Sequence, residues 1–148
     1  MNDADAGEAL NQLLRSAHDS ADGFRQGAAL ARNPAFQSLF QGRAEEREGL
    51  IQTLEAEVRS FGADPAGEGT MTGEVNRLVT LGRNVIARDS DKGLISELVR
   101  RETQVTRSFE AMSNDSAAPE QARKVAAEAL EKLTAEQREL EGLGEQFR

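Results

Sequence analysis

Three charged or polar residues interrupt the apolar stripes of this sequence near the middle of long amphipathic stretches. They are Arg47, Glu102 and Gln137. If these stretches are helices that fold side by side, the three side chains fall in one central layer. Four-helix bundles that bind iron hold their metal ions at this level, on carboxylate and imidazole groups that project inward. The layer therefore has the position of a metal site, and its residue types decide what it can bind.

Four carboxylates can be assembled into an all-carboxylate iron or manganese site: Asp22, Glu46, Glu102 and Glu136. Such a site would make the chain a di-metal oxidoreductase or a metal-storage protein. Bundles of that class usually supply Glu from two helices and a Glu-x-x-His pair from each of the other two. This chain has one histidine, His18, no Glu-x-x-His, and 30% charged residues, so glutamates on solvated helix faces are expected anyway. We therefore expect no catalytic residue, no metal and no cofactor, and keep iron or manganese as the alternative.

Arg47 favours a structural role for the central layer. A guanidinium stays protonated and would place a fixed positive charge beside any bound cation, whereas it can satisfy Glu102 through paired hydrogen bonds. We predict that Arg47, Glu102 and Gln137 form a polar brace that sets the helix register, with Arg43 and Arg101 as further candidates. In a second interpretation, Arg47 and Glu102 lie at the edge of the stripe with their charged ends in water.

The elements that position these residues are four predicted helices. Apolar residues recur at three- and four-residue spacing over Glu8–Ala31, Pro34–Phe61, Lys92–Met112 and Ala122–Phe147. Asn33-Pro34 separates the first two, because Asn can cap a helix and Pro suits its first position. Ser90 or Asp91 is expected to cap the third helix.

The connections predict the topology. Two short joints favour antiparallel neighbours, whereas residues 62–90 form a long connection that begins with a Gly- and Pro-rich loop. Two antiparallel helical hairpins joined by one crossover is the ferritin-like plan, and the apolar spacing of residues 75–86 predicts a short fifth helix within the crossover. We expect one all-α domain over residues 1–148, with residues 1–7 as a disordered tail.

Composition excludes several classes of function. There is no cysteine, so disulfides, thiolate catalysis and cysteine-ligated metal are excluded. A net charge of -8 opposes binding to nucleic acid and to anionic lipid, and six Phe without Trp or Tyr provide no stacking platform. No stretch is apolar for long enough to span a membrane, so a cytoplasmic protein is the default expectation.

Several segments resemble an uncharacterised bacterial ferritin-like four-helix-bundle family, a domain-of-unknown-function group. The similar segments include HDSADGFRQGA, LFQGRAEEREGLIQTLEAEVRSFGADPAGEGTMTGEVNRL and ISELVRRE. The matching positions are Asp19, Gly23, Phe24, Arg25, Phe40, Arg43, Arg47, Leu54, Glu57, Val58, Gly62, Pro65, Gly69, Gly73, Arg77, Glu97, Arg101 and Glu102. Relatives often carry Trp, Tyr and His where this chain has Val79, Phe109 and Gln137. The resemblance implies a fold and a bacterial origin, and supplies no catalytic residues.

We therefore predict a non-enzymatic bundle that acts through self-association or through interaction with another protein. A stress-related setting is implied by the resemblance. Val75, Val79 and Ile86 are apolar beyond what one inward stripe per helix requires, so they either cover the flank of the bundle or build a subunit interface.

Overall fold

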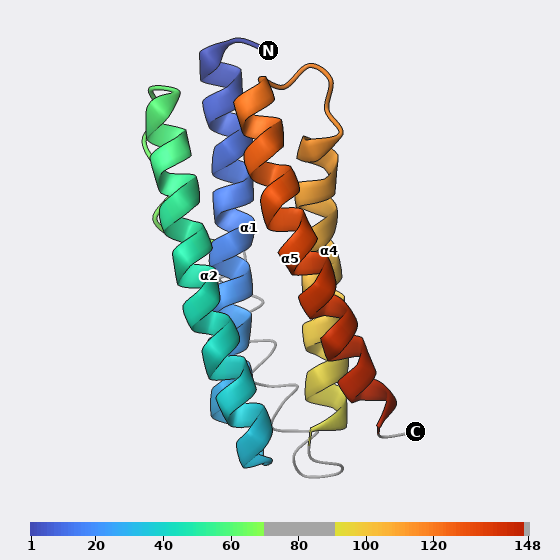
Figure 1. Ribbon diagram of the computed structural model, residues 1–148. Coiled ribbons are helices and arrows are strands. Elements are labelled where there is room, and N and C mark those ends of the chain that lie inside the picture. The colour runs from blue at the N-terminus through green and yellow to red at the C-terminus, as the bar shows by residue number, and fades with distance from the viewer. Residues whose placement is uncertain (70–90, 147–148) are drawn as a thin grey trace.

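The protein is described by a computed structural model that covers residues 1–69 and 91–146 (Figure 1). The described residues form four helices: α1 (Asp3–Leu30), α2 (Pro34–Ser60), α4 (Lys92–Ser113) and α5 (Glu120–Glu145). Throughout these two ranges the regular structure is helical, so the predicted all-α bundle is confirmed. The fifth helix predicted at residues 75–86 lies outside the described residues.

The first helix begins earlier than predicted. The Asn2 side chain caps α1 by accepting a hydrogen bond from the Asp5 amide at 2.8 Å, and acidic residues in the first turn complement the helix dipole. Ala6 and Gly7 are buried, and a Cβ on Gly7 would come within 2.9 Å of the Ala63 Cβ. The disordered tail predicted for residues 1–7 is therefore wrong from Asp3 onward, because capping and close packing order the segment.

The turn between α1 and α2 is held by a residue from far along the chain. The Asn33 side chain caps α2 by accepting from the Ala35 amide at 2.8 Å. The buried Asp91 carboxylate accepts from the amides of Arg32 at 2.8 Å and Asn33 at 3.0 Å. Asp91 precedes α4 as predicted, but its side chain makes no capping hydrogen bond to that helix. It instead ties the start of α4 to the α1–α2 turn.

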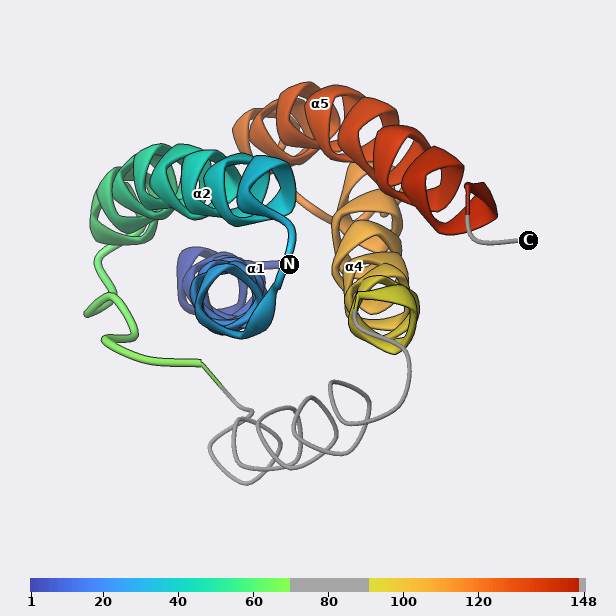
Figure 2. The same cartoon turned by 90° about the horizontal axis from the view of Figure 1, so that it is seen from below.

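The helices form two antiparallel hairpins, α1 with α2 and α4 with α5, which meet most closely through α1 and α4. Seen along the bundle, the ring order is α1, α2, α5, α4 (Figure 2). After α2 the chain turns back along α1, where Asn11 donates to the Asp64 carbonyl at 2.9 Å and accepts from the Ala66 amide at 2.8 Å. The connection thus leaves the end where α2 stops, and α4 begins at the other end. As a result, α2 and α4 run in the same direction.

Two apolar clusters make up the core. One lies toward the start of α1 and includes Leu10, Leu14, Leu54, Phe109 and Leu133. The other lies toward the α1–α2 turn and includes Phe24, Phe40, Leu94, Leu98 and Leu140. A layer of polar side chains separates them. Among the described helices, none has an apolar stretch of the length and hydropathy needed to cross a bilayer.

Candidate functional site: a buried polar layer

Each of the four helices contributes one side chain to the polar layer. Arg47, with 2% of its surface exposed, donates from Nε to Ser20 Oγ at 2.8 Å, from Nη1 to Glu136 Oε1 at 3.1 Å and from Nη2 to Glu102 Oε2 at 3.4 Å. Ser20 in turn donates to Glu102 Oε1 at 2.6 Å. The guanidinium therefore bridges the two carboxylates and links both hairpins.

The underside of the guanidinium faces an aromatic ring. The Arg47 Cζ atom lies 5.5 Å from the centroid of Phe24, at the distance of a cation–π contact. Phe24 also packs against Phe40, with ring centroids 6.1 Å apart. The charged group thus lies on the edge of an apolar cluster, which strengthens its hydrogen bonds because water is excluded.

The layer extends outward between α2 and α5. Arg43 places Nη1 at 2.6 Å from Glu136 Oε2 and Nη2 at 2.6 Å from Glu139 Oε2, with 12% of its side chain exposed. Glu46 lies 3.7 Å from Arg43 and 3.9 Å from the exposed Lys132. This outer part of the layer is a chain of ion pairs that reaches solvent.

Burial and charge shift the carboxyl pKa values in opposite directions. Burial raises the pKa of Glu102, although Arg47 and the Ser20 hydroxyl counteract it. Burial also acts to raise the pKa of Glu136, but a hydrogen bond with Glu46 and the charges of Arg47 and Arg43 bring it below its ordinary value. That same hydrogen bond, with some burial, raises the pKa of Glu46. Glu136 is therefore kept ionised by the hydrogen bond with Glu46 together with the two guanidinium groups.

The structure places Gln137 outside the layer, contrary to the sequence prediction. Its amide donates to Thr103 Oγ1 at 2.9 Å and to Glu141 Oε1 at 3.1 Å on the partly exposed side of α5. Glu136, one position earlier, takes the inward place. Both positions fit the spacing between the buried Leu133 and Leu140, so the apolar pattern alone did not distinguish them.

Two further placements differ from the prediction. Arg101 is buried on the α1–α4 side, where its Nε lies 3.6 Å from Glu97 Oε1 and its side chain faces Gly23. Ser20 was not predicted, although it is a small polar residue that fits the same inward spacing as Ala17, Ala21 and Phe24. A search for hydroxyls within apolar stripes would have found it.

The residues present do not fit a di-metal site. Asp22 pairs with Arg25 at 2.8 Å on the surface, away from the other candidate ligands. Arg47 lies between Glu102 and Glu136, and it occupies the space that a bridged cation would need. His18 points to the loop after α2, with Nε2 at 3.2 Å from the Ala66 carbonyl oxygen. Across residues 1–69 and 91–146, no group of three or more His, Cys, Asp or Glu side chains is arranged to hold a metal ion.

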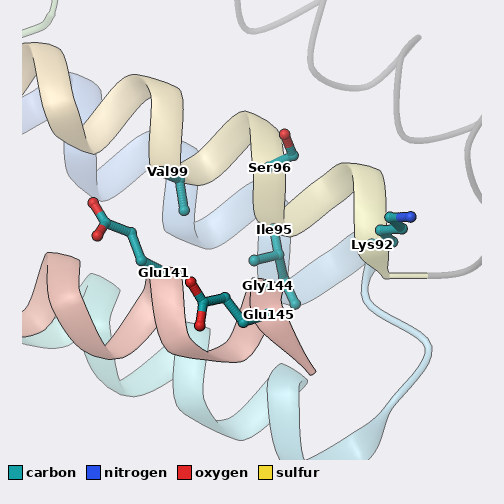
Figure 3. Close-up of a pocket in the computed structure, with 7 residues that line it drawn as sticks. All are labelled: Lys92, Ile95, Ser96, Val99, Glu141, Gly144 and Glu145. Carbon is teal, nitrogen blue, oxygen red and sulfur yellow. The ribbon is translucent and has the colours of Figure 1, made fainter. Parts of the chain in front are cut away.

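One cavity lies near the C-terminal end of α5, and another lies near the middle of this helix. The first, of about 420 Å³, is formed by Lys92, Ile95, Ser96 and Val99 of α4 and by Glu141, Gly144 and Glu145 of α5 (Figure 3). The other, of about 270 Å³, adjoins the polar layer between α2 and α5. The first combines two carboxylates with a lysine and a serine on facing helices. This lining contains no histidine or thiol.

Fold and site together define an antiparallel four-helix bundle with a buried Ser–Arg–Glu–Glu layer. Residues 5–115, well over half of the chain, match the family described as Domain of unknown function (DUF2383), and the chain belongs to this family. The domain-of-unknown-function part of the predicted resemblance is thereby confirmed. The match includes Ser20, Arg47 and Glu102 but ends before α5, which carries Glu136. Neither the curated proteins nor the solved structures contained a match.

Proposed function

We propose that this chain is a non-enzymatic, ferritin-like four-helix bundle that acts by associating with copies of itself or with another protein. The parallel course of α2 and α4 supports the ferritin-like topology, because a simple up-down-up-down bundle would place them antiparallel. The proposed setting is the bacterial cytoplasm. A stress-related role stays a prediction that rests on the resemblance.

The observation that carries the proposal is the position of Arg47. Its guanidinium is buried, permanently charged and hydrogen-bonded to three helices at the level where related architectures place metal ions. An arginine bonded in this way neither donates a lone pair to a metal nor accepts a proton from a substrate. The layer is therefore suited to holding the two hairpins in register.

Association would use a polar surface. Within the described parts of the chain, Met1 is the one large apolar side chain that is exposed. A net charge of -8 favours a basic surface on any different partner, and contact between two copies would require opposite charges to be paired locally. The apolar positions Val75, Val79 and Ile86, which were expected to cover a flank or build an interface, lie outside the described residues.

Metal analysis tests the non-enzymatic part of the proposal. The purified chain is incubated with ferrous or manganous salt, desalted, and examined for bound metal and for oxygen consumption. We expect neither stoichiometric metal nor ferrous oxidation. Stoichiometric iron that disappears in Glu102→Gln, together with oxygen consumption by the unchanged chain, would overturn the proposal.

Mass in solution tests association. A monomer has a mass of 16.1 kDa, so light scattering after size-exclusion chromatography separates one copy from several. We expect a larger mass at low salt, or capture of a basic protein that high salt releases, since screening weakens contacts between charged surfaces. A strict monomer that captures no protein at either ionic strength would contradict the proposal.

A further inference from the structure

The two hairpins meet along two seams that are built differently. Along the α1–α4 seam the helices approach closely: a Cβ on Gly27 would lie 3.1 Å from Leu98 Cδ1, and Ser20 bonds directly to Glu102 at 2.6 Å. Along the α2–α5 seam the backbones seldom approach, and long charged side chains span the gap. In Figure 2 this second seam lies between the α2 and α5 ribbons.

Two of the four ion pairs that join α2 to α5 in the described residues share one carboxylate, that of Glu136. Glu136 Oε2 lies 2.6 Å from Arg43 Nη1, and Glu136 Oε1 lies 3.1 Å from Arg47 Nη1. Arg43 also reaches Glu139 at 2.6 Å. Because Arg43 and Arg47 are one helical turn apart on α2, Glu136 is the group that offsets the mutual repulsion of their charges.

The seam is also incompletely filled. A cavity of about 270 Å³ lies beside the bridges, with Leu50, Ala129 and Leu133 among its walls and Glu46 and Lys132 also lining it. A volume of this size can hold several water molecules, at roughly 30 Å³ for each in the liquid. Fewer apolar contacts are therefore lost when α2 separates from α5 than when α1 separates from α4.

We propose that the α2–α5 seam is an acid-sensitive latch. Protonation of Glu136 releases α5 from Arg47 and leaves Arg43 with only the exposed Glu139 on that helix, and the bundle opens along this seam while the α1–α4 seam stays closed. The inference rests on the geometry of the seam and is independent of the proposed association.

The groups that surround Glu136 determine how the latch responds. Arg43, Arg47 and Glu46 face it from α2, Glu102 approaches it from α4, the uncharged Ser20 faces Arg47 from α1, and Glu139 and Lys132 are its charged neighbours on α5. Its pKa is lowered, so Glu136 stays charged to a lower pH than an ordinary glutamate would. Because the pKa of Glu102 is raised, Glu102 is already protonated when Glu136 becomes neutral. Arg47 then keeps Glu102 and Ser20 as uncharged hydrogen-bond partners, while Arg43 faces Arg47 without the charge that had lain between them.

The absence of cysteine from the sequence allows the two seams to be measured separately. Spin labels on the exposed pair Thr53→Cys and Ala127→Cys report on α2–α5, and labels on the exposed pair Gln12→Cys and Glu110→Cys report on α1–α4. Pulsed electron resonance distances are recorded as the pH falls, alongside the helical circular dichroism signal. We expect the α2–α5 distance to lengthen while the α1–α4 distance and the helical signal hold. If the two distances lengthen together, or neither changes before the helices melt, the latch does not exist.

A matched pair of variants tests the role of Glu136 at neutral pH. Glu136→Gln should lengthen the α2–α5 distance and speed amide exchange over residues 128–140 by at least about tenfold, since it removes one partner of a buried ion pair. Glu131→Gln makes the same chemical change at an exposed position of the same helix and should alter neither measurement. Equal behaviour of the two variants would overturn the proposal. If Glu136→Gln does not fold, the pH series on the labelled chain decides.

Discussion

The central layer has a dry half and a wet half that are built from the same chemistry. In the dry half, Arg47 is enclosed with Glu102 and Ser20, and its side chain is 2% exposed. In the wet half, Lys132 lies 3.9 Å from Glu46, and its side chain is 63% exposed. Both halves pair a cation with a carboxylate, yet only in the dry half are both side chains almost fully buried. The comparison teaches that burial, and not the number of ion pairs, distinguishes the charges whose removal should cost the most stability.

The largest effect is expected from removing the buried cation. Arg47→Met leaves Glu102 and Glu136 buried without their shared partner, so the free energy of unfolding should fall by about 3–5 kcal/mol. Urea denaturation measures this loss. Arg25→Met, which removes an exposed arginine paired with Asp22, is the control and should cost less than about 1 kcal/mol.

The same measurement tests whether Arg47 and Glu102 act as a pair. In the double variant Arg47→Met with Glu102→Gln, part of the loss should be recovered, because the second change removes a buried charge that the first left unpaired. If the losses of the two single variants simply add, the charged ends of Arg47 and Glu102 are hydrated independently. That result would favour the second interpretation of the sequence, in which both charged ends lie in water.

The next largest effect on stability is expected at Glu136, and its neighbour on α5, Gln137, provides the comparison. Glu136→Ala removes the hydrogen-bond acceptor of Arg47 and the ion-pair partner of Arg43, and it should cost about 1.5–3 kcal/mol, the range for a hydrogen bond to a charged group. Gln137→Ala removes contacts to Thr103 and Glu141 on a partly exposed face and should cost about 1 kcal/mol or less. Thermal or urea unfolding ranks the two variants. A larger stability loss for Gln137→Ala than for Glu136→Ala would support the sequence prediction that Gln137 belongs to the polar layer.

The pH dependence of stability should differ in sign between the two buried glutamates. The pKa of Glu102 is raised above 4.5 on folding, so its contribution is present at acid pH and is lost as the pH rises through the folded value. The pKa of Glu136 is lowered, so its contribution is present above 4.5 and is lost as the pH falls through the folded value.

Urea unfolding at a series of pH values from pH 7 down to roughly pH 3 measures both contributions. The stability advantage of the unchanged chain over Glu102→Gln should shrink as the pH rises, whereas its advantage over Glu136→Gln should grow. Parallel slopes for the two variants would contradict the assignment of the two carboxyl groups.

The smallest effect is expected in the wet half. Lys132→Gln breaks an exposed pair with Glu46 and should change the free energy of unfolding by less than about 1 kcal/mol. The change should vanish at high salt, since exposed charges are screened. Denaturation at two salt concentrations measures it, and a cost comparable with that of Arg47→Met would remove the distinction between the two halves.

The sequence alone determined the helices, their approximate ends and the presence of charges at the centre, because apolar periodicity and capping residues act locally. Arg47 and Glu102 were predicted in this way, since each interrupts an apolar stripe near its middle. The choice of Glu136 over Gln137 was decided only by tertiary structure. The two residues differ by about 100° around α5, and the packing of α5 on α4 sets which one faces inward.

Tertiary structure also decided the roles of Ser20, Asp91 and the first turn of α1. Ser20 bonds to Arg47 and Glu102 because three helices bring those groups together, and Asp91 accepts amides from a turn far away in the sequence. Local pattern determines whether a residue lies inside a helix and roughly which side it faces. Which partner it meets depends on how the helices pack, and that is information that no single stretch of sequence contains.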